Sequence, residues 1–137
     1  MKTTIKIVST TLSLIGLMTF GAFTLGATDC TDTTTLVASG SSGSICSSAA
    51  FTSGASSTIN GDVSAKAAVT LGASSKASGS VKSGAAFTSG ANSVVSGNVT
   101  AVGDITLGAK SRIAGTVHSG TGVITYGDGA TVGTVLP

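Results

Sequence analysis

The chain has 137 residues, of which 20 are Gly, 9% are charged and 4% are aromatic, and its formal net charge is +2. Two of its seven basic residues, Lys2 and Lys6, lie at the very start, and the other five are balanced by five aspartates. A chain whose body is neutral has no electrostatic reason to bind nucleic acid or an anionic membrane.

Residues 1–27 have the pattern of a secretory signal peptide. A short basic start is followed by an apolar run over residues 7–20 and by small residues up to Ala27, the order that signal peptides share. The alternative is a transmembrane anchor, but the run is shorter than the roughly 20 apolar residues that a span needs. We therefore predict cleavage after Ala27, no membrane span afterwards, and a periplasmic or extracellular location.

Residues 28–48 contain both cysteines of the chain, Cys30 and Cys46. In an exported chain two cysteines most simply form one disulfide, and closing a loop of about 15 residues is worth roughly 3 kcal/mol. Two free thiols or a metal pair are the alternatives, and a metal pair lacks ligands because His118 is the only His. The prediction for 28–48 is an N-terminal cap, built as a degenerate coil and stapled by a Cys30–Cys46 disulfide.

Residues 49–137 repeat with a period of 18. The heptapeptide AAFTSGA occurs at 49–55 and again at 85–91, and AAVTLGA lies between the two copies. One slip occurs at Gly127, which lies one residue past its column, and Gly133 returns to register. The repeat produces these columns: Gly54, Gly72, Gly90 and Gly108; Gly61, Gly79, Gly97, Gly115 and Gly133; Val63, Val81, Val99, Val117 and Val135; and Phe51, Val69, Phe87, Ile105 and Val123.

A finer period of six divides each 18-residue unit into three short strands and three corners. Large apolar residues recur every six positions, except that every third site holds Ser and the apolar residue follows two positions later, as in Ser57 and Ile59. Small residues recur where a chain would turn a tight corner. We predict an all-β fold with one domain, a parallel β-helix of about 18 residues per triangular coil, because one coil alone cannot bury its inner face.

The inward side chains alternate between two versions of the coil. Phe51 is followed two residues later by Ser53, whereas Val69 is followed by Leu71. Residues two apart on a strand face the same way, so a big–small pair in one coil is predicted to stack on a medium–large pair in the next. The repeating unit is therefore a two-coil block.

Nothing in the sequence indicates catalysis, a metal site or a cofactor. His118 is unpaired and falls in an outward column, and Asp62 and Asp104 lie in different columns, so no acid/base pair can be assigned. Glycan binding is disfavoured because the chain lacks Trp and has one Tyr, Tyr126. We predict that the protein is not an enzyme.

One outward column is regular. Thr lies in the same position of four successive coils, and a flat ladder of this kind is typical of solenoid proteins that bind ice. The simpler explanation is that Thr suits an exposed strand. The candidate surface-binding ladder, for ice or another surface, consists of Thr52, Thr70, Thr88 and Thr106.

The segment from Gly103 to His118 (GDITLGAKSRIAGTVH) resembles the repeat of bactofilins, the polymer-forming cytoskeletal proteins, as do Ser57–Val63 and Ser93–Val99. The resemblance covers about residues 49–135. It implies a right-handed triangular β-helix that joins end to end without nucleotide, and the C-terminal edge is the expected contact between copies. Bactofilins typically face the cytoplasm, so the predicted signal peptide is a departure. The sequence thus predicts a secreted, non-enzymatic structural or surface-assembly solenoid that associates with itself, with ice binding as the alternative.

Overall fold

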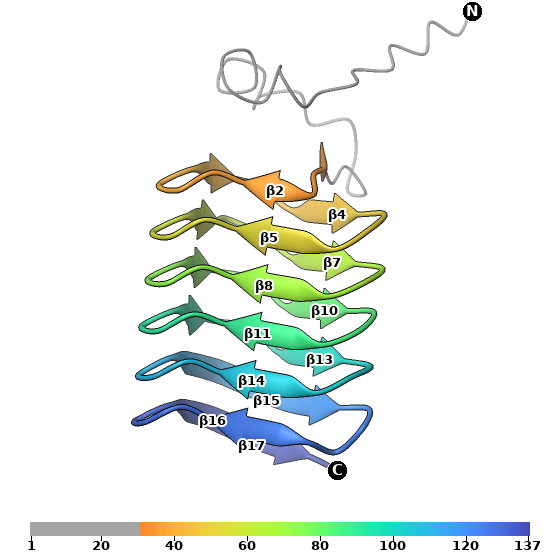
Figure 1. Ribbon diagram of the computed structural model, residues 1–137, viewed down its shortest axis with the longest axis vertical. Coiled ribbons are helices and arrows are strands. Elements are labelled where there is room, and N and C mark those ends of the chain that lie inside the picture. The colour runs from red at the N-terminus through yellow and green to blue at the C-terminus, as the bar shows by residue number, and fades with distance from the viewer. Residues whose placement is uncertain (1–30) are drawn as a thin grey trace, which may run out of the picture.

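The computed structural model describes residues 31–137, which form a parallel β-solenoid without a helix (Figure 1). The predicted fold and period are confirmed, since Val81 pairs in parallel with Val63 on one side and Val99 on the other. Seen from the N-terminal coil, the chain turns clockwise as it advances, so the solenoid is right-handed (Figure 1). The predicted signal peptide and Cys30 lie outside the described residues.

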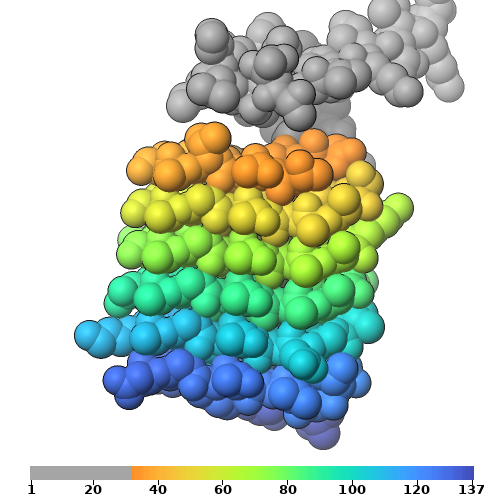
Figure 2. All heavy atoms as spheres, in the orientation of Figure 1, coloured from red at the N-terminus to blue at the C-terminus, as the bar shows by residue number. Residues whose placement is uncertain are grey.

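Each coil places one short strand on each of three faces, and we number the coils 1 to 6 by their strand on the second face. The first face holds β1 (Thr31–Asp32), β4 (Ile45–Ser47), β7 (Val63–Ala65), β10 (Val81–Ser83), β13 (Val99–Ala101) and the second half of β15 (Arg112–Ser119). The second face holds β2 (Thr35–Leu36), β5 (Phe51–Ser53), β8 (Val69–Leu71), β11 (Phe87–Ser89), β14 (Ile105–Leu107) and β16 (Ile124–Tyr126). The third face holds β3 (Ser41–Ser42), β6 (Thr58–Ile59), β9 (Lys76–Ala77), β12 (Val94–Val95) and the first half of β15, and β17 (Thr131–Leu136) pairs along β15. Figure 2 shows the coils as even layers of one straight column.

The core is a narrow column of side chains from all three faces. Phe87 is fully buried between Val69 and Ile105, and Ser89 on the same strand lies between Leu71 and Leu107. The predicted alternation of big–small and medium–large coils is therefore confirmed. Because each bulky ring meets a smaller side chain above and below, the layers fill the column without a clash.

Buried serines on the third side are satisfied by neighbouring groups. Ser75 Oγ donates to the Gly54 carbonyl at 2.9 Å, and Ser57 Oγ donates to Ser75 Oγ at 3.1 Å. Ser93 and Ser111 donate to carbonyls three residues earlier at 2.7 Å each. No buried side-chain N or O among the described residues lacks a hydrogen-bond partner, so these serines carry no unpaired polar group into the core.

Two kinds of corner impose different backbone demands. A Cβ on Gly97 would lie 2.6 Å from the carbonyl carbon of Gly79 in the preceding coil, so this corner requires glycine because the coils approach too closely for a side chain. The corner before the third face instead uses a left-handed residue in every coil, for example Ser74 with φ 58° and Lys110 with φ 56°. Left-handed backbone is costly for residues other than Gly and Asn.

A chain of side-chain caps runs along the corner between the third and first faces. Ser44 Oγ accepts a hydrogen bond from the Asp62 backbone N–H at 3.3 Å, and Asp62 Oδ1 accepts from the Ser80 N–H at 2.7 Å. Ser80 Oγ accepts from the Asn98 N–H at 3.2 Å, and Asn98 Oδ1 accepts from the Thr116 N–H at 2.8 Å. Each coil therefore caps a backbone donor of the coil that follows it.

In the last coil, one member of a predicted column was wrong. Ile124, not Val123, pairs with Ile105, and Val123 is 49% exposed. An extra residue in the preceding corner, which includes Gly122 at φ 77°, shifts the strand by one position. The predicted return to register is confirmed, because the pairing of β15 with β17 shifts between Ile113 and Thr116.

Candidate functional site: the Thr face and the open edge of coil 6

The second face carries one outward Thr in each strand, and we call it the Thr face. Thr88 pairs with Thr70 on one side and with Thr106 on the other, and Thr52 pairs with Thr70. The flanking residues of these strands point inward and are buried, so the Thr side chains stand on the solvent side. The structure thus brings the four predicted ladder residues into one column.

Two further Thr residues complete this column, and sequence reasoning missed both. Thr35 of β2 pairs with Thr52, and Thr125 of β16 pairs with Thr106. Each of the two lies one position later in the chain than the repeat of the inner coils would place it, so neither falls in the sequence column. Each of the two is followed by a large residue, Leu36 or Tyr126, just as Thr70 is followed by Leu71. This pair of residues is the signal in the sequence that could have identified them.

The hydroxyls of the Thr face make no hydrogen bond to protein in the part of the chain that the structure describes. Outward hydroxyls elsewhere behave differently, since those of Ser44 and Ser80 accept backbone N–H groups at the corner. A hydroxyl without a protein partner is free to bind water or another surface.

One charge borders the Thr face on the side where the strands begin. Backbone hydrogen bonds place Ala68, Ala86, Asp104 and Val123 in one line along this border. The Asp104 carboxylate accepts a hydrogen bond from the Thr121 hydroxyl at 2.6 Å. The border is therefore small and apolar for most of its length and becomes acidic near coil 5.

Three basic residues lie on the other two faces, and Lys66 and Lys110 lie in corners that border the Thr face. Lys76 and Arg112 occupy one column of the third face with Val94 between them, and Lys82 and His118 occupy one column of the first face. One uncharged coil thus separates the charge of Lys76 from that of Arg112. It keeps the charges near the screening length at moderate salt.

The acidic, His and Cys side chains among residues 31–137 are scattered. No set of three or more His, Cys, Asp or Glu side chains there could hold a metal ion. Asp62 caps a corner and Asp104 binds Thr121, so these two carboxylates are engaged at separate places. Asp62 and Asp104 thus each hold a neighbouring coil or corner in place through a hydrogen bond.

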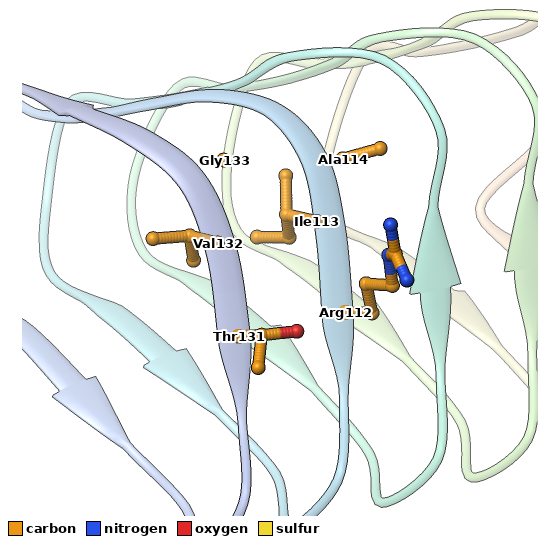
Figure 3. A pocket seen from close by; sticks show the side chains of 6 residues that line it. All are labelled: Arg112, Ile113, Ala114, Thr131, Val132 and Gly133. Atoms are coloured by element: carbon orange, nitrogen blue, oxygen red, sulfur yellow. The ribbon is translucent and has the colours of Figure 1, made fainter.

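A shallow hollow of about 280 Å³ lies between β15 and β17 (Figure 3). It occurs where the register of these strands shifts, because β17 has one residue fewer than β15 between the pairs Ile113–Val132 and Thr116–Thr134. Arg112 is its only charged residue, and its side chain extends away from β17. The hollow is lined by Arg112, Ile113, Ala114, Thr131, Val132 and Gly133.

The last coil leaves apolar side chains uncovered. Tyr126 is in register with the buried Leu107 but is 47% exposed, and Val135 is in register with the buried Val117 but is 46% exposed. Each of the strands β16 and β17 pairs on one side only. We call these strands and their inward side chains the open edge of coil 6.

A family model described as "Bactofilin: Polymer-forming cytoskeletal" matches residues 30–135. The chain belongs to the bactofilin family. No curated protein and no solved structure matches it in the corresponding searches. Membership indicates a structural, polymer-forming protein and confirms the resemblance seen in the repeat.

The family match begins at Cys30, so it includes residues 30–48 of the predicted cap and leaves the predicted signal peptide outside. In the cap, Cys46 of β4 is in register with Asp32 of β1, which lies two residues after Cys30. The chain just after Cys30 therefore runs beside Cys46. The disulfide itself stays a prediction, because Cys30 lies outside the described residues.

None of the described residues forms a helix with the length and apolar character needed to cross a bilayer.

Proposed function

We propose that this bactofilin is an exported, non-enzymatic structural protein whose copies associate through the open edge of coil 6. The observation that carries the proposal is the half-exposed state of Tyr126 and Val135, which occupy columns that are fully buried in the inner coils. Covering these side chains with another apolar layer removes them from water, as every inner coil already does for its neighbour.

A second copy of the chain fits this edge best. Edge strands present unpaired N–H and C=O groups, and natural proteins normally cover such edges. Another solenoid supplies strands of the same length and inward columns with the same spacing, so it can continue both the hydrogen bonds and the core. The polymer-forming description of the family supports this choice.

The test compares charged substitutions at the edge with one elsewhere on the rod. In Tyr126→Asp and Val135→Asp a carboxylate would be buried in the contact, which is strongly unfavourable without a partner. Val102→Asp is the matched control, because Val102 is 64% exposed but belongs to coil 5 rather than to the open edge. Sedimentation velocity and electron microscopy of the processed chain measure the state of association.

The proposal expects assemblies of the wild-type chain and of Val102→Asp, and mainly monomers of the two edge variants. A dimer that stops growing would indicate that two coil 6 edges meet, whereas filaments require contacts at both ends. A wild-type chain that stays monomeric at high concentration would overturn the proposal, and so would edge variants that assemble as well as Val102→Asp.

Export is the second element of the proposal, and it rests on the pattern of residues 1–27. Expressing the whole chain and sequencing the N-terminus of the accumulated protein tests it. A mature protein that begins at Thr28, outside the cytoplasm, is expected. Protein that retains Met1 inside the cell would instead agree with the cytoskeletal description of the family.

Ice binding by the Thr face is a second candidate function. The observation that favours it is the unpartnered column through Thr52, Thr70, Thr88 and Thr106. It does not compete with end-to-end association, because the two functions use different surfaces. Thermal hysteresis and ice recrystallisation assays of Thr70→Tyr and Thr88→Tyr test it, and a wild-type chain without activity would exclude it.

A further inference from the structure

The Thr face stays in line even where the coil length changes. In coil 1, the corner from Ser42 to Ile45 is one residue shorter than the corner from Ile59 to Val63, with which it is in register. In coil 6 the extra residue lies in the corner before Ile124. Both changes occur outside the face, which leaves a straight ladder of six rungs: Thr35, Thr52, Thr70, Thr88, Thr106 and Thr125.

The rungs share a spacing and a chemistry. Neighbouring strands lie about 4.8 Å apart in the hydrogen-bonding direction, so the six hydroxyls and six methyl groups repeat at that interval along the rod. The strands that carry the rungs lie side by side in one sheet (Figure 1). None of the hydroxyls is committed to another group among the described residues.

The chemistry of the face limits what it can bind. An anionic polymer needs a row of cations, but Lys76, Lys82 and Arg112 lie on the other faces. Lys66 and Lys110 lie singly in corners on opposite sides of the Thr face, outside its strands. A glycan platform needs aromatic rings, and Tyr126 at the open edge is the only aromatic side chain of coil 6. A neutral, regular array of hydroxyl and methyl groups fits a neutral, regular surface of water molecules.

We propose that all six rungs form a single ice-binding face and that Asp104 limits its strength. This inference rests on the second candidate function above and assigns its residues. Asp104 directly precedes β14, two residues before the Thr106 rung, and its carboxylate accepts a hydrogen bond from the Thr121 hydroxyl at 2.6 Å, so it lies at the border of the Thr face beside coils 5 and 6. A charged group holds its own hydration shell strongly, so it disturbs the ordered water that the Thr rungs would share with ice.

The test uses the processed full-length chain and measures thermal hysteresis at equal concentration. Thr70→Tyr and Thr88→Tyr interrupt the centre of the ladder and should abolish activity. Thr35→Tyr and Thr125→Tyr shorten it by one rung each and should lower activity at least twofold. Asp104→Ala should raise activity at least twofold.

Thr100→Tyr is the matched control, because Thr100 is an exposed Thr at the centre of a strand on the first face. It should leave thermal hysteresis unchanged. Circular dichroism establishes that each variant keeps the fold. Sedimentation of the same samples separates loss of the face from loss of association.

The outcomes distinguish the two proposals. If the wild-type chain shows no thermal hysteresis, ice binding fails altogether. If only the central variants lose activity while the Thr35 and Thr125 variants match wild type, ice binding stands and the six-rung face is wrong. An equal loss of thermal hysteresis in Thr100→Tyr would also overturn the inference. So would a Thr88→Tyr variant that converts a dimer to a monomer when no ice activity is found, because the Thr face would then be a contact between copies.

Discussion

Phe87 of coil 4 lies directly in register with Ile105 of coil 5, and both side chains are fully buried. The ring fits there because Ser89, two residues later, leaves room beside the neighbouring leucines. The positions of Phe87 and Ser89 are therefore coupled, although each resembles an ordinary buried residue by itself.

This coupling predicts a non-additive pair of substitutions. Ser89→Leu alone overfills the core and should cost about 1–3 kcal/mol, and Phe87→Val alone leaves a cavity and should cost about 2–4 kcal/mol. Phe87→Val with Ser89→Leu rewrites the coil in its neighbour's version, so we expect it to lose less than half of the summed cost. Urea unfolding of the three variants measures this, and simple additivity would contradict the packing argument.

The glycine corner predicts a second contrast. Gly97→Ala places a Cβ 2.6 Å from the backbone of Gly79 and should destabilise the protein by about 1–3 kcal/mol, because backbone cannot move aside as a side chain can. Gly43→Ala is the control, since nothing lies within 4 Å of its Cβ. Equal melting temperatures for the two variants would show that the coils do not approach as closely as described.

The left-handed corner predicts a gain of stability. Ser74 has φ 58°, and replacing it with Gly should stabilise the fold by about 0.5 kcal/mol, because the relief of backbone strain exceeds the entropy cost of glycine. Ser78→Gly, at an exposed position without a positive φ, should instead destabilise by about 0.5 kcal/mol. The opposite signs in thermal unfolding are the observation to look for, and two losses would disprove the account.

The predicted disulfide has a thermodynamic consequence. Cys30→Ser, Cys46→Ser and the double variant should each lose about 3 kcal/mol, because all three remove the same loop closure. Reductant should destabilise the wild-type chain by a similar amount and leave the variants unchanged. Intact-mass measurement before and after reduction counts the bond directly. A wild-type chain whose stability does not change with reductant would exclude the Cys30–Cys46 disulfide.

Most of the fold was predictable because each coil repeats the same physical problem. An inward column such as Val63 and Val81 must be apolar in every layer, so the 18-residue period is visible in the sequence. The register of coils 1 and 6 was not predicted correctly, because their changes in length lie in corners, where no core residue marks the register. Val123 was therefore misplaced, and Thr35 and Thr125 were missed.

Features that depend on conformation rather than residue type were also hidden. The left-handed corner is occupied by Ser in some coils, by Asn92 in one and by Lys110 in another, so no column of identical letters reveals it. The corner caps likewise use hydroxyl, carboxylate and amide oxygens, which share only the ability to accept a hydrogen bond. The candidate surfaces were predictable in location but not in extent.

The corner caps also have a direction. Every cap from Ser44 to Asn98 lies in one coil and receives a backbone donor from the next, never the reverse. A coil that has just left the ribosome would therefore find these side-chain acceptors already in place on the preceding one. It supplies a backbone acceptor in return, since the Ile45 N–H donates to the Asp62 carbonyl at 2.8 Å. The fold is suited to growth from its N-terminal end, each finished turn serving as the template for its successor during synthesis.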